Sequence, residues 1–162
     1  MTGYVCIMKK IGILTLILVF SISCVSTKNT IQNIDDNAIL PNIISGRFEL
    51  VETATDLQYG YNEFYPINLG FSAYENSNNL NVNRFFNSFT GTNGEKVTYK
   101  LLETCCPFPS KRNKMGAGTL ELYEIYLDGK PSNKKIYVNT FEKGKVMCPK
   151  GFLIKKTGTS DN

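Results

Sequence analysis

The sequence predicts an α+β domain: a small antiparallel sheet of about three to five strands with one short amphipathic helix packed on it. Three observations lead to this fold class. Several stretches rich in β-branched and aromatic residues lie between glycine, proline and asparagine turns. One stretch carries its apolar residues at helical spacing. The connections between consecutive strand candidates are short, which favours antiparallel neighbours.

The first elements of the domain are expected to be short. Phe48–Thr53 is a strand candidate that follows the breaker Gly46. The stretch 55–70 is aromatic and punctuated by glycine, and it predicts an irregular strand or a packed loop. Pro66 argues against a central strand there, because proline cannot donate to a strand ladder.

The clearest helix candidate runs from Asn81 to Phe89. Its apolar residues recur at i, i+3, i+4 and i+7, which places them on one face: Val82, Phe85, Phe86 and Phe89. Asn79 or Asn81 can cap the start, and Gly91 can end the helix. We expect the aromatic face to belong to the core.

Three longer strand candidates follow the helix: Val97–Cys106, Thr119–Leu127 and Lys135–Phe141. Asp128-Gly129 predicts a turn before the third, with the connection running on through residues 131–133. A short strand is expected within Gly151–Lys155. The loop between the first two strands contains basic residues: Lys111, Arg112 and Lys114.

The N-terminus has the pattern of an export signal. Lys9 and Lys10 precede an apolar run of 12 residues, and Ser23 and Cys24 follow it. As a helix the run would span only about 18 Å, too short for a hydrocarbon core of about 30 Å. A cysteine after a small residue resembles the lipobox of bacterial lipoproteins, in which that cysteine is acylated, for example with palmitate, and becomes the N-terminus.

The chain is therefore expected to have four parts. Residues 1–23 form the signal peptide, with Met8 as the more natural start, and Cys24 is the lipidation site. Residues 24–44 are rich in Ser, Thr, Asn and Asp and predict a flexible tether. Residues 45–156 form a single α+β domain, and residues 157–162 form a disordered tail.

Composition excludes several kinds of chemistry. The chain has no histidine, which excludes histidine bases and histidine metal ligands. No phosphate loop or dinucleotide fingerprint is present, so no cofactor is expected. The region Lys130–Lys156 contains eight lysines and one acid. It predicts a solvated surface, or a patch that faces anionic lipid head groups, another polyanion or an envelope protein. Nucleic acid is not expected, because the compartment is wrong and these lysines lack arginine partners.

Three cysteines remain after Cys24: Cys105, Cys106 and Cys148. Adjacent cysteines in a strand point to opposite faces, so only one of the first two is expected to reach Cys148 in a disulfide. Buried free thiols and a redox or metal role are the alternatives. Glu103, on an otherwise apolar strand face, is either an acid of raised pKa or a residue at the sheet edge with a lysine partner.

Four segments resemble a group of small lipoproteins of Bacteroidetes such as flavobacteria: YGYNEFYPINLG, NRFFNSFTGTNGEKVTYKLLETCCPF, LELYEIYLDG and IYVNTFEKGKVMCPKGF. In that group the position of Cys148 is more often a small residue, which leaves Cys105 and Cys106 as the cysteines to explain. Members often carry the label of 2-dehydro-3-deoxyphosphooctonate aldolase. Such an aldolase is a cytosolic barrel, and about 250 residues is typical for a barrel. Cleavage here leaves 139 residues and the chain carries an export signal, so this activity is not expected.

These observations favour a non-catalytic binding or structural domain, held in the cell envelope by a lipid. Val25, rather than aspartate, follows Cys24, which under the enterobacterial rule favours the outer membrane facing the periplasm. The alternative is a small envelope enzyme or thiol-redox factor that uses Cys105 and Cys106.

Overall fold

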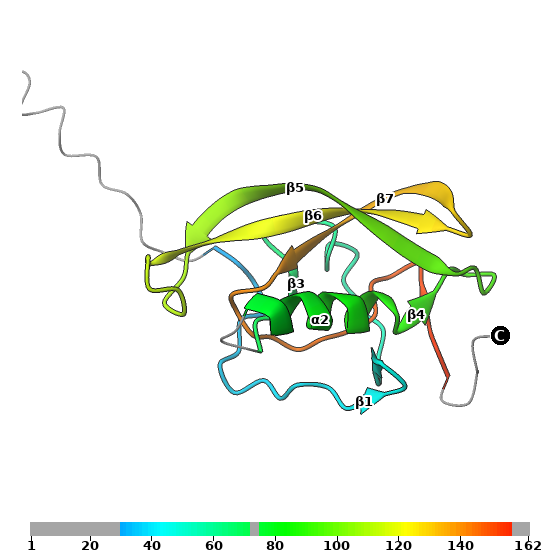
Figure 1. Cartoon of the computed structure of the whole chain (residues 1–162), viewed down its shortest axis with the longest axis horizontal. Helices are drawn as coiled ribbons and strands as arrows, with labels where there is room; N and C mark the ends of the chain where they lie inside the picture. Colours follow the sequence, from blue (N-terminus) through cyan, green and yellow to red (C-terminus); the bar gives the residue numbers. More distant parts are fainter. Residues whose placement is uncertain (1–29, 72–74, 157–162) are drawn as a thin grey trace, which may run out of the picture.

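The computed structural model describes residues 30–71 and 75–156. The expected signal peptide, the lipidation site Cys24 and the tail 157–162 lie outside these residues. The described chain is mostly β-strand with one helix. Figure 1 shows a long twisted sheet arching over this helix, with short N-terminal strands on the other side of it. The expected α+β arrangement is therefore confirmed in outline, in a domain dominated by strands.

The main sheet has the strand order β3-β7-β6-β5. Its strands are β3 (Ile67–Asn68), β5 (Val97–Pro109), β6 (Ala117–Leu127) and β7 (Lys130–Asn139). The three long strands form the expected antiparallel meander. Strand β3 pairs parallel to β7, so the expectation of a purely antiparallel sheet is wrong at this edge. Pro66 directly precedes β3, and an edge strand tolerates the missing N–H.

The β6–β7 hairpin turns on two residues. Asp128 and Gly129 both have left-handed φ angles of 47° and 77°, as a type I′ turn requires. Leu127 then pairs directly with Lys130. The expected continuation of the turn through residues 131–133 is wrong, because those residues belong to β7 and a register shift after Ile125 accommodates them.

Helix α2 runs from Glu75 to Phe86, so the expected limits of 81 and 89 are wrong at both ends. The hydroxyl of Ser88 donates a hydrogen bond of 2.6 Å to the carbonyl of Arg84 and accepts one of 3.0 Å from the backbone N–H of Phe48. These bonds tie the chain beyond the helix to the N-terminal part of the domain. No helix within residues 30–71 and 75–156 is long and apolar enough to span a bilayer.

Four strands of two residues complete the described structure: β1 (Ile43–Ile44), β2 (Arg47–Phe48), β4 (Phe89–Thr90) and β8 (Leu153–Ile154). β1 pairs with β2, and β4 pairs with β8, both antiparallel. The short C-terminal strand is thus confirmed. The strand expected over 48–53 is reduced to β2 and a bridge from Thr53 to Cys148.

The core lies between α2 and the main sheet and is rich in aromatic side chains. Phe86 is fully buried and stacks on Tyr99 with ring centroids 4.2 Å apart. It also makes edge contacts with Phe85, Phe89 and Tyr123. The expectation that the phenylalanine face belongs to the core is confirmed.

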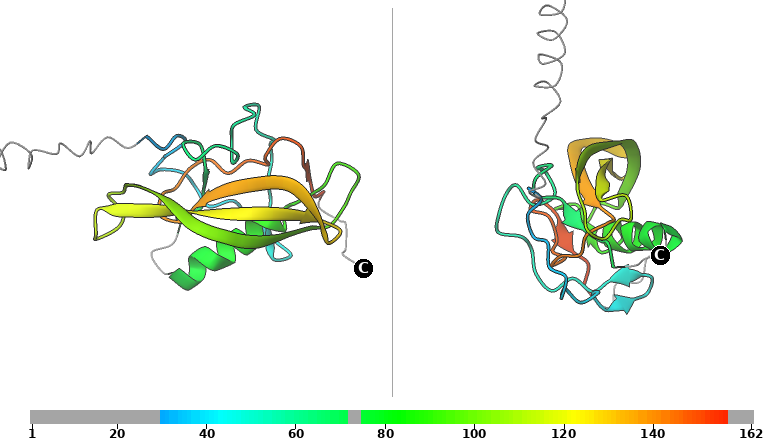
Figure 2. Two further views of the ribbon diagram at one scale, coloured as in Figure 1. Left: turned by 90° about the horizontal axis from the view of Figure 1, so that it is seen from above. Right: turned by 90° about the vertical axis from the view of Figure 1, so that its left-hand side faces the viewer.

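The expected tether 24–44 is wrong from Thr30 onward, because this part of the segment is bound to the domain. The side-chain amide of Asn68 donates to the carbonyl oxygens of Gln32 and Asn33, at 3.0 and 2.8 Å. The N–H of Asp35 donates to the carbonyl of Lys143 at 2.9 Å. Figure 2 shows the segment, in blue, lying against the domain.

Candidate functional site

Cys105 and Cys106 are joined to each other by a disulfide in the last part of β5. The expected bridge to Cys148 is therefore wrong. The alternation of side chains fails here because Cys106 has a left-handed φ of 56° and the pairing with β6 shifts between Cys105 and Phe108. Both cysteines are partly exposed.

This disulfide contributes little as a structural crosslink. In the chain-entropy model, closing a loop of about two residues stabilises by about 1 kcal/mol, whereas a loop of about 40 residues would contribute about 4 kcal/mol. A bond between neighbours restricts the unfolded chain only locally. The Cys105–Cys106 disulfide therefore alters the local chemistry of β5 more than it stabilises the fold.

Cys148 is a buried free thiol. Burial raises its pKa to about 12, against a hydrogen bond from Thr53 that lowers it. Its backbone N–H donates to the carbonyl of Glu52, and its carbonyl accepts from Ala54. The thiol is therefore neutral at physiological pH and belongs to the core, as the alternative of a buried free thiol predicted.

A cavity of about 780 Å³ lies between the N-terminal segment and the connection from β5 to β6. Ile31, Ile34 and Asp36 line one side. The other side carries the basic residues of the connection: Lys111, Arg112 and Lys114. Arg112 lies 3.9 Å from the carboxylate of Asp36, which joins the two sides.

Ser110 and Glu142 form a buried pair in the wall of this cavity. They are 3% and 4% exposed, and the serine hydroxyl donates to the carboxylate at 2.5 Å. The backbone N–H of Arg112 donates to the same hydroxyl oxygen at 3.3 Å. The hydroxyl hydrogen of Ser110 is therefore engaged in the bond to Glu142, and this bond links the end of β5 to the chain that follows β7. With basic side chains at its rim, the cavity suits an anionic or polar group.

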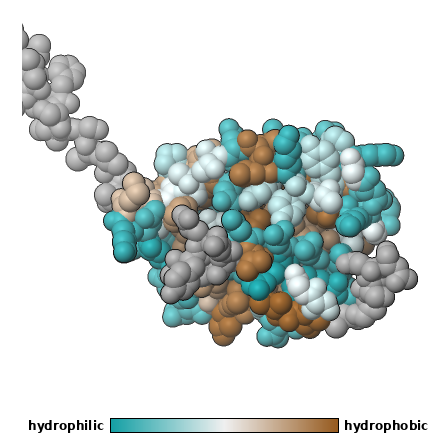
Figure 3. Space-filling model, viewed as in Figure 1, coloured by the Kyte–Doolittle hydropathy of each residue, from teal (hydrophilic) through white to brown (hydrophobic). Residues whose placement is uncertain are grey.

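Glu103 is exposed on β5, the edge strand of the main sheet. The expected position at the sheet edge is confirmed, but the lysine partner expected with it is not found among the described residues. The expected apolar face ends before it, because the pairing with β6 shifts between Leu101 and Glu103. Leu101 and Leu102 are partly exposed as a result. Figure 3 shows the hydrophobic residues of this view in separate groups, with hydrophilic residues between them.

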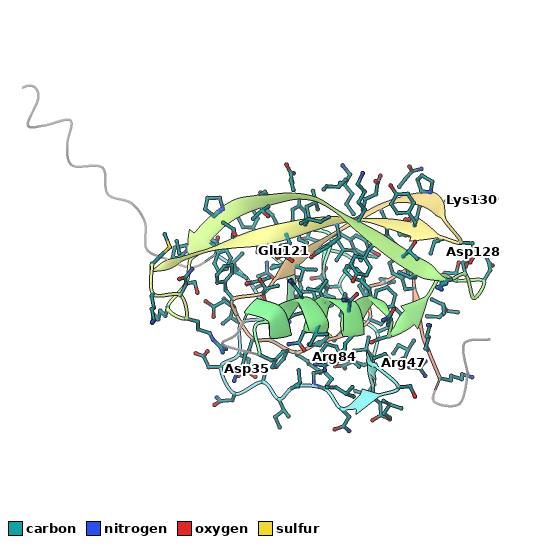
Figure 4. All side chains as sticks on the ribbon, viewed as in Figure 1. Asp35, Arg47, Arg84, Glu121, Asp128 and Lys130 are labelled. Carbon is teal, nitrogen blue, oxygen red and sulfur yellow. A yellow bond between two sulfur atoms is a disulfide. The ribbon has the colours of Figure 1, made fainter. Side chains whose placement is uncertain are left out.

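The lysines of the region 130–156 are spread over several places. The ammonium of Lys134 lies over the rings of Tyr61 and Phe152, 5.8 and 5.7 Å from their centroids. Lys145 pairs with the carboxylate of Glu52 at 2.5 Å. Lys130 lies at the β6–β7 turn, at the right-hand end of the domain in Figure 4. Lys134, Lys135 and Lys150 line one open groove of about 490 Å³.

No group of three or more acidic or cysteine side chains in the described part of the chain is arranged to hold a metal ion. Sequence reasoning missed the Ser110–Glu142 pair. Glu142 did stand out as the single acid of the lysine-rich region, but its contact with Ser110 joins residues 32 positions apart. Comparisons with protein families, with curated proteins and with solved structures find no match for this chain.

Proposed function

We propose that the protein is a lipid-anchored protein of the cell envelope, held in the outer membrane on its periplasmic side. Its domain binds or supports another envelope component and does not catalyse a reaction. The observation that carries the proposal is the sequence Lys9-Lys10, the apolar run and Cys24. A basic start, an apolar stretch and a small residue before a cleavage point are the features of an export signal.

The described site favours binding over catalysis. Its only hydroxyl–carboxylate pair among the described cavity residues, Ser110 and Glu142, is buried and mutually satisfied. The thiol of Cys148 is buried and neutral at physiological pH. Basic side chains at the cavity rim suit recognition of an anionic group, such as those of envelope lipids and glycans.

The test is the intact mass of the protein extracted from its own membranes. The proposal expects a chain that begins at Cys24 and carries acyl groups. Cys24→Ser should abolish both acylation and cleavage at this point, whereas Cys6→Ser, the matched control before Met8, should change neither. A protein without lipid that begins at another residue would contradict the proposal. Crosslinking in intact cells then tests for the bound component, and capture of no peptidoglycan, lipid, sugar or protein would remove the binding role.

The Cys105–Cys106 disulfide favours a second candidate, a thiol-redox factor. A protein dithiol would transfer two electrons and two protons to the bond, becoming a disulfide itself and leaving two thiols on β5. Alkylation should label these two cysteines only after mild reduction, and it should leave Cys148 unlabelled in the folded protein. If a Cys105→Ser, Cys106→Ser double variant has unchanged phenotype and activity, this candidate is eliminated.

A further inference from the structure

We infer that the connection between β5 and β6 is a membrane-contacting surface that rests on anionic lipid head groups. Its contact residues are Lys111–Met115, here named the basic tip. The inference rests on the proposed lipid anchor at Cys24. It adds an orientation: the domain lies on the bilayer by one defined end.

A lipid on Cys24 would keep the start of the described domain at a short distance from the membrane. Six residue steps separate Cys24 from Thr30, the first described residue. At full extension, about 3.6 Å per residue, they reach about 22 Å. Whatever path the intervening residues take, Thr30 stays within that distance of the lipidated cysteine.

The chain cannot gain length by unwinding beyond Thr30, because the next residues are fastened. The N–H of Gln32 donates to the carbonyl of Phe64 at 2.7 Å, and Asn68 holds the carbonyls of Gln32 and Asn33. The side chain of Asn33 donates to the carbonyl of Lys145 at 2.8 Å. A Cβ at Gly144 would overlap the carbonyl oxygen of Asn33, so the two backbones are in close contact.

The basic tip lies at the end of the domain where this segment begins. Thr30 and Ile31 line a hollow of about 90 Å³ together with Cys106 and Pro107. Ile31 also lines the larger cavity opposite Lys111 and the other basic residues of the connection. Figures 1 and 2 both show the β5–β6 connection and the start of the described chain at the same end of the molecule.

The chemistry of the tip matches an anionic bilayer. Lys111, Arg112 and Lys114 are exposed, and no acidic residue lies between Ser110 and Gly116. The nearest acid to the tip is Asp36, whose carboxylate lies 3.9 Å from Arg112 and leaves the two lysines without an acidic partner in the connection. Met115 is 87% exposed, an apolar side chain beside three cations. Cations attract anionic head groups, and an unbranched apolar side chain can enter the boundary of the acyl region.

Hydrogen bonds within the connection also order the basic tip in the absence of a membrane. Asn113 accepts from the N–H of Met115 at 3.1 Å and donates from its side chain to the carbonyl of Ala117 at 2.6 Å. The N–H of Ser110 donates to the carbonyl of Gly116 at 3.0 Å. Binding therefore requires little ordering of the loop. By contrast, Lys130 of the lysine-rich region lies at the opposite end, beside Asp128 in Figure 4.

The test uses the full lipidated chain, with acylation at Cys24 first verified by mass. An environment-sensitive fluorophore is placed at Met115→Cys, or at Lys130→Cys as the control at the opposite end. The protein is reconstituted in vesicles of phosphatidylcholine, with or without phosphatidylglycerol. The Met115 probe should shift to the blue and be quenched by lipid-attached quenchers in the anionic vesicles, and the Lys130 probe should do neither.

A charge series supplies the second readout. In a chain that begins at residue 24 with Cys24→Ser, and so lacks both the lipid and the apolar signal segment, each basic residue near the surface should contribute roughly fivefold to vesicle binding. Replacing Lys111, Arg112 and Lys114 by glutamine should therefore weaken binding at least about 25-fold, the effect of the two lysines alone, because Arg112 is already paired with Asp36. The same change at Lys130, Lys135 and Lys150 is the matched control and should have a much smaller effect.

The outcomes separate this inference from the proposed function. A chain that is not acylated removes the proposed function. An acylated chain whose Met115 probe stays as water-exposed as the Lys130 probe overturns the inference alone. Equal losses in the two charge variants also overturn it, as does a tip that binds a soluble polyanion but not anionic vesicles.

Discussion

Replacing Asn68 with alanine should release the N-terminal segment while the domain stays folded. Asn68 is fully buried in β3. Its amide nitrogen donates to the carbonyls of Gln32 and Asn33, and its oxygen accepts from the side chain of Asn139 at 3.0 Å. Alanine removes all three hydrogen bonds.

The loss of stability depends on which of the former hydrogen-bond partners water can reach. The carbonyls of Gln32 and Asn33 become hydrated once the segment lifts, so losing these two bonds costs about 1 kcal/mol each. The buried amide of Asn139 is not hydrated, and an unsatisfied buried donor costs about 1–3 kcal/mol. We therefore expect the free energy of unfolding to fall by about 3–5 kcal/mol, which a domain near the middle of the usual range of about 5–15 kcal/mol survives.

Urea unfolding followed by circular dichroism measures the global change, and hydrogen exchange locates it. The amides of Gln32 and Asp35, which donate to Phe64 and Lys143 in the native protein, should exchange at least about tenfold faster. Asn87→Ala, at an exposed asparagine, is the matched control and should leave these rates unchanged. A folded Asn68→Ala variant with native protection at both amides would refute the reasoning.

Three further predictions concern the core, the segment contact and the buried thiol. Phe86→Ala should lower the free energy of unfolding by about 3–5 kcal/mol, whereas the partly exposed Leu101→Ala should change it by far less; equal urea midpoints would contradict this. Gly144→Ala should speed exchange at Gln32 and Asp35 as Asn68→Ala does, because its Cβ overlaps the Asn33 carbonyl; unchanged rates would show that the segment is not packed there. The pKa of Cys148 is raised from 9.0 to about 12, so its stabilising contribution is complete below pH 9.0 and is lost as the pH rises toward about 12. Urea midpoints measured across that range should therefore fall less steeply for Cys148→Ala than for the wild type, and parallel curves would argue against burial of the thiol.

The long strands were predictable because their signals are local. Alternating apolar residues and the Asp128-Gly129 turn define the hairpin of β6 and β7 without help from distant parts of the chain. The end of the helix was not predictable in this way. Phe89 has helical spacing from Phe86, but it lies beyond the end of α2 and pairs with the distant Ile154 in β4 and β8, a contact that no local pattern indicates.

The candidate site was likewise predictable only where its signals are local in the sequence. The basic residues of the β5–β6 connection are evident in the sequence, but their cavity depends on the segment that polar composition predicted to be a tether. That segment is held by Asn68, whose burial no local pattern indicates. The pairing of Cys105 with Cys106 depends on the left-handed backbone of Cys106, which a strand pattern does not predict.

The parallel pairing of β3 with β7 also determines when the chain can fold. Ile67 pairs with Val138, Thr53 bridges to Cys148, and the rings of Phe89 and Phe152 lie 4.8 Å apart. Contacts between such distant positions form slowly, because the long loop between them must close first. The N-terminal half therefore cannot complete its core until the C-terminal residues have been synthesised. The apolar side chains of that half therefore lack their final partners for most of the time that the chain is being synthesised.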